Sequence, residues 1–401
     1  MISFYKRDHV GLACFGSTIS KHEVFRSMDL VVRKKEFLHE LQLFQGIVER
    51  KNTIPVLANV LLEAEGDKAR MVATDLEVAL DVRFSAKVKK GGTLTLPAKK
   101  LFEIVRALPD TNITIREEGQ GVVKVSADNF ESRIKTLPRQ DFPTLPKADN
   151  KETFKLPGQT LRNLITRTQF AITGEDTRYF LNGALFYFTA DALTLVATDG
   201  HRLALITGKQ KSVEKTKKGK GEAPRVILPR KTLTELTKLL TEDVKEVGYQ
   251  QSENHLFFEL GERVLISRMI DGQFPAYERV IPKGNDKAVE FDNDRLTAAI
   301  KRVAVLSNER SQAVKIQINK NKVEITSNTP DVGEASEELD VQYTGDSVQI
   351  CLNAKYVLDF LSVVETNSVR FEFKDETTQA VMQPVGLEGY NYTYVIMPMR
   401  I

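Results

Sequence analysis

Three side chains with the chemistry of an acid–base site lie within four consecutive positions of the chain. Asp199, His201 and Arg202 stand in the stretch ATDGHRLAL, residues 197–205, and apolar residues flank them. A carboxylate beside an imidazole suits general acid–base catalysis, and a guanidinium suits an anionic ligand. An Asp side chain can equally accept hydrogen bonds from nearby backbone N–H groups and hold a turn. Three interpretations are therefore open: catalysis, a turn, and binding of a partner.

The rest of the sequence does not complete a catalytic site around this stretch. An acyl-transfer site needs a nucleophile held by a base and an orienting group, and no nucleophile-elbow glycine pattern is present. A phosphoryl-transfer site needs a glycine-rich cradle, and the lysine- and glycine-rich segment 209–221 lacks the P-loop spacing. An enzyme that works without a metal, through Asp199 and His201, is kept as the alternative hypothesis.

Histidine and cysteine are too scattered to predict a metal site. The five histidines form no pair at ligand spacing, and Cys14 and Cys351 match neither a metal motif nor a disulfide framework. Such cysteine usage is typical of a reducing compartment, and no stretch approaches the roughly 20 apolar residues of a membrane helix. We therefore expect a cytoplasmic protein with no cofactor and no metal.

An internal repeat separates the turn from the rest of the motif. The stretch ATDLEVAL, residues 73–80, keeps the Ala-Thr-Asp of residues 197–199 but lacks the Gly-His-Arg that follows them, and TSNTPDVGEA, residues 326–335, is a weaker third copy. The shared Thr-Asp predicts a turn in which the Asp side chain caps local backbone N–H groups. The Gly-His-Arg belongs to the middle copy alone, which favours a binding surface over a catalytic relay.

The elements around these motifs recur in the same order three times. Each repeat of about 120–130 residues contains two amphipathic helical patterns and several short alternating runs such as LTLVAT, which predict strands. We predict an α+β fold of antiparallel sheets with helices on one face. The expected domains are residues 28–146, 152–282 and 287–401, after an extension at 1–27 that precedes a second possible start, Met28. Segment 209–221 is expected to be a surface loop.

Charge is distributed unevenly between the predicted helices and the rest of the chain. The whole chain carries a formal net charge of +3, whereas the helical segments 33–50, 97–108, 158–173, 229–240, 292–307 and 353–364 together carry +8. Lysine and arginine on the polar sides of helices attract phosphates, although ordinary solvated helix faces also carry such charges. No zinc-finger, basic-zipper or RNA-recognition signature is present, so base-specific readout is not indicated.

Several long motifs, in the same order, resemble one known family. ATDGHRLAL, RYFLNGALF (178–186), VILPRK (226–231), DGQFPAYERVIP (271–282) and YVIMPMR (394–400) are similar to the bacterial sliding clamps, the beta subunits of DNA polymerase III, and the resemblance runs from Met28 to Ile401. It implies three DNA-clamp domains per chain and a head-to-tail homodimer closed into a ring around double-stranded DNA, without sequence preference. It also implies a non-catalytic processivity factor that tethers the replicative polymerase, and that a separate clamp loader opens the ring.

The resemblance implies particular DNA contacts. Glu175 stands where a contacting glutamine is known in the family, and its carboxylate should repel phosphate. Arg50, Arg230 and Lys231 are further candidates because of their charge and helix positions. The positions that match family contacts are Lys51, Lys99, Glu175, Tyr179 and Phe180.

The resemblance also implies a hydrophobic groove between the second and third domains, where polymerases, the loader and repair proteins dock short linear peptides. Flexible methionines suit a groove that accepts many peptides. The matching residues are Leu181, Thr198, Gly200, His201, Arg202, Leu203, Pro275, Arg279, Val280, Val395, Ile396, Met397, Pro398, Met399 and Arg400. For the dimer interface the resemblance implies Val305 and Leu306 against Ile134, with Ser132 in place of an expected aromatic residue.

Overall fold

The computed structural model describes residues 27–48, 53–119, 121–148, 153–174, 176–189, 191–209 and 225–400, together with the backbone of Glu214–Lys215. The expected extension at 1–27, apart from its last residue, and most of segment 209–221 lie outside these described residues. Three of the candidate DNA contacts also lie outside them: Arg50, Lys51 and Glu175.

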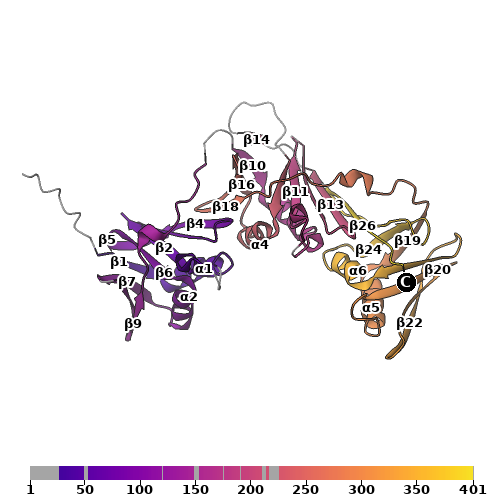
Figure 1. Cartoon of the computed structure of the whole chain (residues 1–401), viewed down its shortest axis with the longest axis horizontal. Helices are drawn as coiled ribbons and strands as arrows, with labels where there is room; N and C mark the ends of the chain where they lie inside the picture. The colour runs from indigo at the N-terminus through magenta and orange to yellow at the C-terminus, as the bar shows by residue number, and fades with distance from the viewer. Residues whose placement is uncertain are drawn as a thin grey trace, which may run out of the picture.

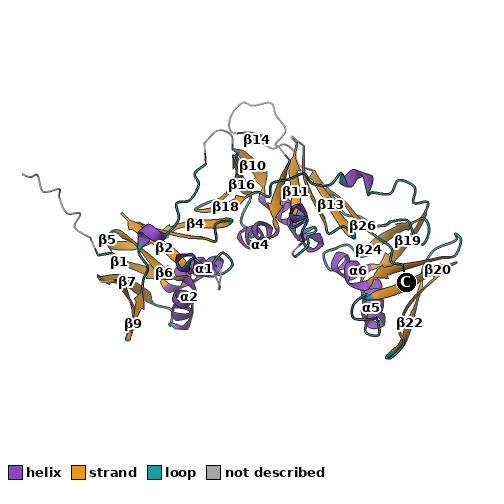
Figure 2. Ribbon diagram, viewed as in Figure 1, coloured by secondary structure: helices purple, strands orange, loops and turns teal. Residues whose placement is uncertain are grey.

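The described chain forms an arch of three α+β domains (Figure 1). The first domain lies at one end of the arch, the second at its crown and the third at the other end. The α-helices lie on the inner, concave side of the arch and strands form its outer side (Figure 2). The predicted fold class of three domains with antiparallel sheets and two helices each is thereby confirmed.

The elements of each domain follow one order along the chain. The first domain contains β1 (Asp29–Arg33), α1 (Lys34–Phe44), η1 (Pro55–Ala58), β2 (Asn59–Glu65), β3 (Lys68–Thr74), β4 (Val78–Ser85), β5 (Lys87–Lys90), β6 (Gly92–Pro97), α2 (Ala98–Ala107), β7 (Asn112–Gly119), β8 (Val122–Ala127), β9 (Phe130–Lys135) and η2 (Arg139–Asp141). The second contains β10 (Phe154–Pro157), α3 (Gly158–Thr166), η3 (Gln169–Ala171), η4 (Tyr179–Leu181), β11 (Gly183–Phe188), β12 (Ala192–Thr198), β13 (Arg202–Lys209), β14 (Glu214–Lys215), β15 (Val226–Pro229), α4 (Arg230–Leu239), β16 (Glu246–Ser252), β17 (His255–Leu260), β18 (Arg263–Arg268) and η5 (Tyr277–Arg279). The third contains β19 (Lys287–Asp292), α5 (Asn293–Ala304), β20 (Ala313–Asn319), β21 (Lys322–Thr329), β22 (Gly333–Asp340), β23 (Val348–Asn353), α6 (Ala354–Leu361), β24 (Ser368–Phe373), β25 (Ala380–Pro384) and β26 (Tyr390–Ile396).

Two sheets run across the domain boundaries and make the arch continuous. The nine-stranded sheet has the order β14-β10-β16-β17-β18-β4-β3-β2-β6, and its β18–β4 pair joins the second domain to the first. The eight-stranded sheet has the order β15-β11-β12-β13-β26-β25-β24-β19, and its β13–β26 pair joins the second domain to the third. Backbone ladders between domains position side chains across each junction.

The other two sheets stand at the ends of the arch. The first domain ends in the five-stranded sheet β5-β1-β7-β8-β9, and the third ends in the four-stranded sheet β22-β21-β20-β23. Strand β9 is therefore an edge strand at one end, and β22 is an edge strand at the other end (Figure 1). Unpaired edges expose backbone N–H and C=O groups that can pair with another strand.

The six predicted helices are all present because their apolar faces pack against the sheets. In α2, Leu101 and Val105 are completely buried, and Pro97 stands at the N-cap where its missing N–H costs nothing. Helix α3 ends at Thr166, earlier than predicted, and the chain continues as the 3-10 turn η3. The hydroxyl of Thr168 donates to the carbonyl of Leu164 at 2.8 Å at this transition.

Candidate partner-binding groove and DNA-facing surface

The motif that opened the sequence analysis is a tight turn between β12 and β13. The hydroxyl of Thr198 accepts a hydrogen bond from the N–H of Gly200 at 3.1 Å and donates one to the carbonyl of Arg202 at 2.6 Å. Asp199 Oδ1 accepts the N–H groups of His201 at 2.9 Å and Arg202 at 3.0 Å. Gly200 has a φ of +89°, which favours glycine over any residue with a side chain.

The repeat of this motif in the first domain forms the same turn. Asp75 Oδ1 accepts the N–H groups of Glu77 at 2.9 Å and Val78 at 2.6 Å, and Thr74 closes the turn as Thr198 does. Leu76 stands at the position of Gly200 and has a φ of +79°. The predicted role of the Thr-Asp pair as a turn device is confirmed, and the Asp199 carboxylate is occupied by that role.

Arg202 links the turn to the third domain. Its Nε donates to Asp199 Oδ2 at 3.0 Å, and its two terminal nitrogens donate to Asp359 Oδ2 and to the carbonyl of Phe170, each at 2.7 Å. The guanidinium carbon lies 4.3 Å from the ring centre of Tyr356 and 5.3 Å from that of Phe170. Because the side chain is 6% exposed, these contacts fix its orientation.

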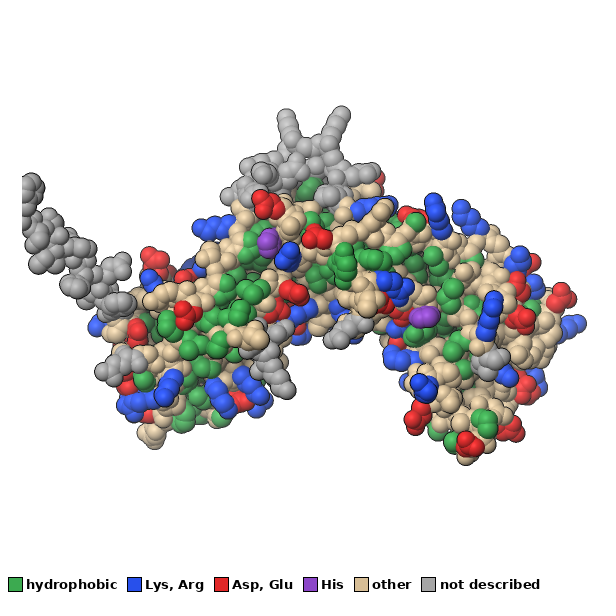
Figure 3. All heavy atoms as spheres, in the orientation of Figure 1, with side chains coloured by type: hydrophobic (Ala, Val, Ile, Leu, Met, Phe, Trp, Pro, Cys, Tyr) green, Lys and Arg blue, Asp and Glu red, His purple; other side chains and the backbone are tan. Residues whose placement is uncertain are grey.

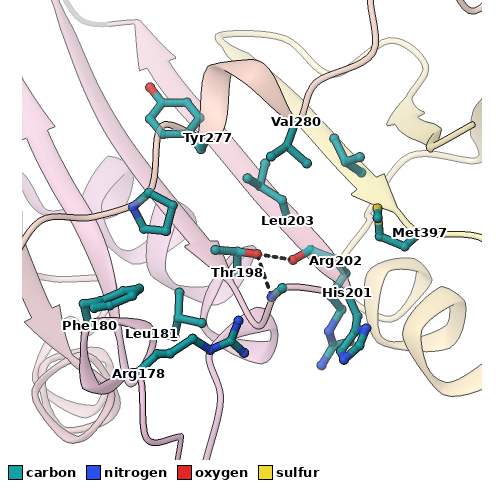
Figure 4. Close-up of a pocket in the computed structure, with 13 residues that line it drawn as sticks. Arg178, Phe180, Leu181, Thr198, His201, Arg202, Leu203, Tyr277, Val280 and Met397 are labelled. Atoms are coloured by element: carbon teal, nitrogen blue, oxygen red, sulfur yellow. Dashed lines mark hydrogen bonds between the residues drawn. The ribbon is translucent and has the colours of Figure 1, made fainter.

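A cavity of about 260 Å³ opens beside this turn. Its wall comes from η4, the β12–β13 turn, the connector after β18 and the end of β26, so four separate segments of sequence build it (Figure 4). Green apolar side chains also gather over β13 and β26 in the space-filling view (Figure 3). The lining residues are Arg178, Phe180, Leu181, Thr198, Gly200, His201, Arg202, Leu203, Pro275, Tyr277, Val280, Val395 and Met397.

Most of the residues predicted for the groove line this cavity, but five of them do not. Ile396 faces the core and is fully buried, because consecutive residues of β26 point to opposite faces and Val395 takes the groove side. Arg279 and Arg400 are exposed outside the lining set, and Met399 bonds through its N–H to the carbonyl of Cys351 at 2.8 Å. Pro398 is also absent from the lining.

Three lining residues were missing from the predicted groove: Arg178, Phe180 and Tyr277. Phe180 was predicted as a DNA contact, yet it lies beside Leu181 on the cavity wall (Figure 4). The tight 3-10 geometry of η4 turns neighbouring residues in different directions, so Tyr179 remains 58% exposed. Tyr277 could have been found from its place two residues after Pro275 in the same connector.

An ion pair between Arg178 and Asp176 lies at the groove rim. Arg178 donates to both carboxylate oxygens of Asp176, at 3.0 and 2.8 Å, and its guanidinium lies beside the open edge of the Gly200 turn. The side-chain and backbone hydrogen bonds from Arg178 lower the pKa of Asp176 to about 2. Asp176 therefore stays ionised near neutral pH and anchors Arg178 at the cavity mouth.

The candidate DNA contacts in the described residues fall into two groups. Lys99 in α2 and Arg230 at the start of α4 are exposed on helices of the concave side. Lys231 is different, because its ammonium bonds to Asp75 and, at 3.1 Å, to the carbonyl of Ile47 in the first domain. The charge of Lys231 is therefore engaged at the junction between the first two domains, and a contact of this residue with DNA stays a prediction.

The predicted interface residues lie at the two ends of the arch. Val305 follows α5 and is 77% exposed, with Leu306 partly buried beside it. Ile134 lies on the edge strand β9, where it is largely buried against the core of its own domain. Ser132, two residues before it, donates to the carbonyl of Val125 at 3.2 Å.

Metal binding and membrane crossing have no support in the described part of the chain. No group of three His, Cys, Asp or Glu residues in it could hold a metal ion. Within the same residues, no helix is both long enough and apolar enough to cross a membrane.

Comparison with known proteins identifies the family. Models of the DNA polymerase III beta subunit match the chain with their N-terminal domain at residues 28–146, their central domain at 155–276 and their C-terminal domain at 278–400. The chain belongs to this family, the bacterial beta sliding clamps. The beta sliding clamp of Pseudomonas aeruginosa is 39% identical over 376 residues and that of Escherichia coli is 34% identical over 379 residues, and each match covers 93% of this chain and 100% of the relative.

Solved structures of clamps agree with the fold. A Pseudomonas aeruginosa sliding clamp bound to griselimycin superposes with a TM-score of 0.86 at 38% identity, covering 94% of this chain and 100% of that one. A clamp from C. crescentus also gives 0.86, at 35% identity, over 94% of this chain and 100% of that one. This clamp is accordingly a processivity subunit of DNA polymerase III, a non-catalytic accessory of the polymerase, and the alternative hypothesis of an enzyme is set aside.

Proposed function

We propose that two copies of this clamp close head to tail into a ring that encircles double-stranded DNA and slides along it in the bacterial cytoplasm. The observation that carries the proposal is the arch itself: six helices line its concave side, and its two ends present unlike edge strands, β9 and β22. Unlike ends make a heterologous contact, and two such contacts close a two-membered ring when each arch spans half a turn.

The edge strands are complementary in charge as well as in position. Strand β22 contains Glu334, Glu337, Glu338 and Asp340 and no basic residue, whereas β9 contains Arg133 and Lys135 against one Glu. Pairing β9 of one copy with β22 of the other would continue a sheet across the interface and satisfy both exposed edges. The exposed Val305 and the partly buried Leu306 would bury their apolar surface against the first domain of the other copy near Ile134.

The DNA contacts we propose hold phosphates and do not read bases. Lys99 and Arg230 on the concave helices supply positive charge, and the exposed Tyr179 supplies an aromatic contact. Contacts to phosphate position DNA without sequence preference, and a small number of them keeps the duplex mobile. Arg50 and Lys51 remain candidates of the same kind, and Glu175 is expected to repel phosphate.

The groove beside the β12–β13 turn is proposed to dock short linear peptides of the replicative polymerase, the clamp loader and repair proteins. Its wall offers Leu181, Leu203 and Val395 to an apolar anchor and Met397 as an adaptable rim. Arg178 and His201 stand at the mouth, so a peptide with a carboxylate beside its apolar anchor should bind best. The griselimycin-bound relative makes that compound a further candidate ligand for this clamp.

Retention on DNA tests the ring. The clamp is loaded on nicked circular DNA with a clamp loader and ATP, the DNA is then cut once, and bound protein is measured before and after the cut. We expect the clamp to stay on the circular DNA. After the cut, we expect it to be lost in the time that it needs to slide off the ends of the linear DNA. Equal loss from circular and linear DNA would show that retention is not topological and would overturn the proposal.

A groove variant tests the docking site separately. His201→Ala removes a side chain from the mouth of the groove, and because only the His201 backbone takes part in the turn, ring assembly should be unchanged. Fluorescence anisotropy with a labelled polymerase peptide should report weaker binding, while sedimentation velocity reports an unchanged dimer. An unaltered peptide affinity would show that the His201 side chain does not contribute to peptide binding.

A further inference from the structure

We infer that Tyr187, which lies outside the cavity lining, is a positioning residue of the peptide groove: its hydroxyl fastens Tyr277 and so sets how readily the groove accepts a peptide. The inference rests on the proposed function of that groove. It concerns the connector 271–282, which crosses the outer side of the arch between β18 and β19 and supplies one wall of the cavity (Figure 1).

The connector has few polar attachments to the sheet beneath it. Among the described residues, every backbone hydrogen bond made by residues 271–282 joins two residues of the connector itself. The side chains of the connector form one hydrogen bond to another described residue: the hydroxyl oxygens of Tyr187 and Tyr277 lie 2.9 Å apart. Apolar packing is not directional, so this hydroxyl pair supplies the directional contact between the connector and the sheet.

Tyr277 links the other two wall residues that the connector contributes. Its N–H donates to the carbonyl of Pro275 at 2.7 Å, and its carbonyl accepts the N–H of Val280 at 2.9 Å. All three residues line the cavity. The ring of Tyr277 packs in the apolar cluster that contains Leu203 and Val395, while its hydroxyl points away from Leu203 (Figure 4). A movement of this ring would therefore shift the whole connector side of the groove.

Tyr187 is the sheet end of this attachment. It lies in β11, where it pairs with Thr194 of β12, and it packs against the same apolar cluster as Tyr277. Arg225 covers its ring, with the guanidinium carbon 4.7 Å from the ring centre, and lies 3.8 Å from the Glu278 carboxylate of the connector. Exposed ion pairs contribute little, and both of these charged side chains are more than half exposed. The hydroxyl pair is therefore the stronger attachment.

A wall that is already in place favours binding because the peptide does not have to order it. When only a fraction of the molecules has the wall in position, the apparent affinity falls by that fraction. Tyr187 does not line the cavity, so losing its hydroxyl should slow association and leave the contacts that govern dissociation unchanged. A side chain that contacts the peptide, as proposed for His201, should instead change dissociation.

The test removes the hydroxyl and keeps the ring. Stopped-flow anisotropy with the labelled polymerase peptide should show that Tyr187→Phe slows association about two- to fivefold, the effect of one partly buried hydrogen bond, at an unchanged dissociation rate. Tyr277→Phe should slow association equally. The double variant should be no slower than either single variant, because all three lack the same bond. Additive losses, or faster dissociation without slower association, would overturn the inference.

Tyr343→Phe is the matched control. Tyr343 is 5% exposed, and its hydroxyl donates to the carbonyl of Asp346 at 2.7 Å in the third domain, away from the groove. The control should lower the thermal stability about as much as Tyr187→Phe and leave peptide association unchanged. Equal association rates for the two variants would show that Tyr187 is only structural and would overturn the inference. Absence of peptide binding by the unmodified clamp is a different result, which would overturn the groove itself together with every role assigned to its wall.

Discussion

Arg202 shows how one residue can shape a groove through its structural contacts. Its position in the sequence suggested a ligand-binding cation, yet its guanidinium donates hydrogen bonds to Asp199, Asp359 and the carbonyl of Phe170. The residue therefore holds the turn that presents His201, and it fixes that turn to α6 of the third domain. Any effect of Arg202 on partner binding should pass through this junction.

Replacing Arg202 with methionine should lower the free energy of unfolding by about 3 kcal/mol, because it leaves the largely buried Asp199 without its charged partner and removes one of the two cations that bond Asp359. Lys355 provides the control: it also bonds Asp359 Oδ2 at 2.7 Å, but its side chain is 58% exposed. Lys355→Met should cost less than about 1 kcal/mol. Urea unfolding measures both, and equal losses would contradict the structural role of Arg202.

The pH dependence of Asp176 follows from its bonds to Arg178. Its carboxyl pKa is lowered from 3.8 to about 2 in the folded protein, so the pair adds stability above pH 3.8 and loses it as the pH falls through about 2. Carboxyl carbon NMR should therefore give a titration midpoint near 2 for Asp176. In Arg178→Ala the midpoint should rise toward 3.8, and an unchanged midpoint would show that Arg178 is not the cause.

At the scale of elements, the periodicity of apolar residues was sufficient to predict the helices but not to predict which residues line the groove. Helices α1 to α6 each bury an apolar stripe whose spacing is visible in the sequence. The groove draws on η4, the β12–β13 turn, a connector and β26, which only the cross-domain pairing of β13 with β26 brings together. Family resemblance supplied most of its residues, whereas the place of Phe180 on the groove wall needed the geometry of η4.

The same limit applies to Lys231. Its charge and its helix are those of a DNA contact, and sequence cannot show that α4 begins against the first domain. Lys231→Met should leave DNA affinity unchanged and lower stability by about 1–3 kcal/mol, because Asp75 is buried and would lose a charged partner. Lys99→Met should do the reverse, weakening DNA binding and its salt dependence. Thermal unfolding and DNA-binding isotherms separate the two variants.

At the scale of the whole molecule, the two ends of the arch carry edge strands of opposite charge. Acidic β22 and basic β9 stand at opposite ends of one chain, so they can meet only between copies. In the proposed dimer the partner strand would supply the sheet ladder and the charges, so neither edge strand would need a large apolar face of its own. The exposed end of α5 would supply the apolar part of the contact.

The dimer should therefore respond to both charge and apolar burial. Raising salt from 0.05 to about 0.5 M should weaken association several-fold, since exposed charge pairs are screened over a few ångströms. Val305→Glu should weaken it far more, because a carboxylate would be buried in an apolar contact. Val385→Glu, after β25 in the same domain and 36% exposed, is the control and should leave the dimer intact. Sedimentation velocity measures all three, and a Val305→Glu protein as dimeric as the control would place the interface elsewhere.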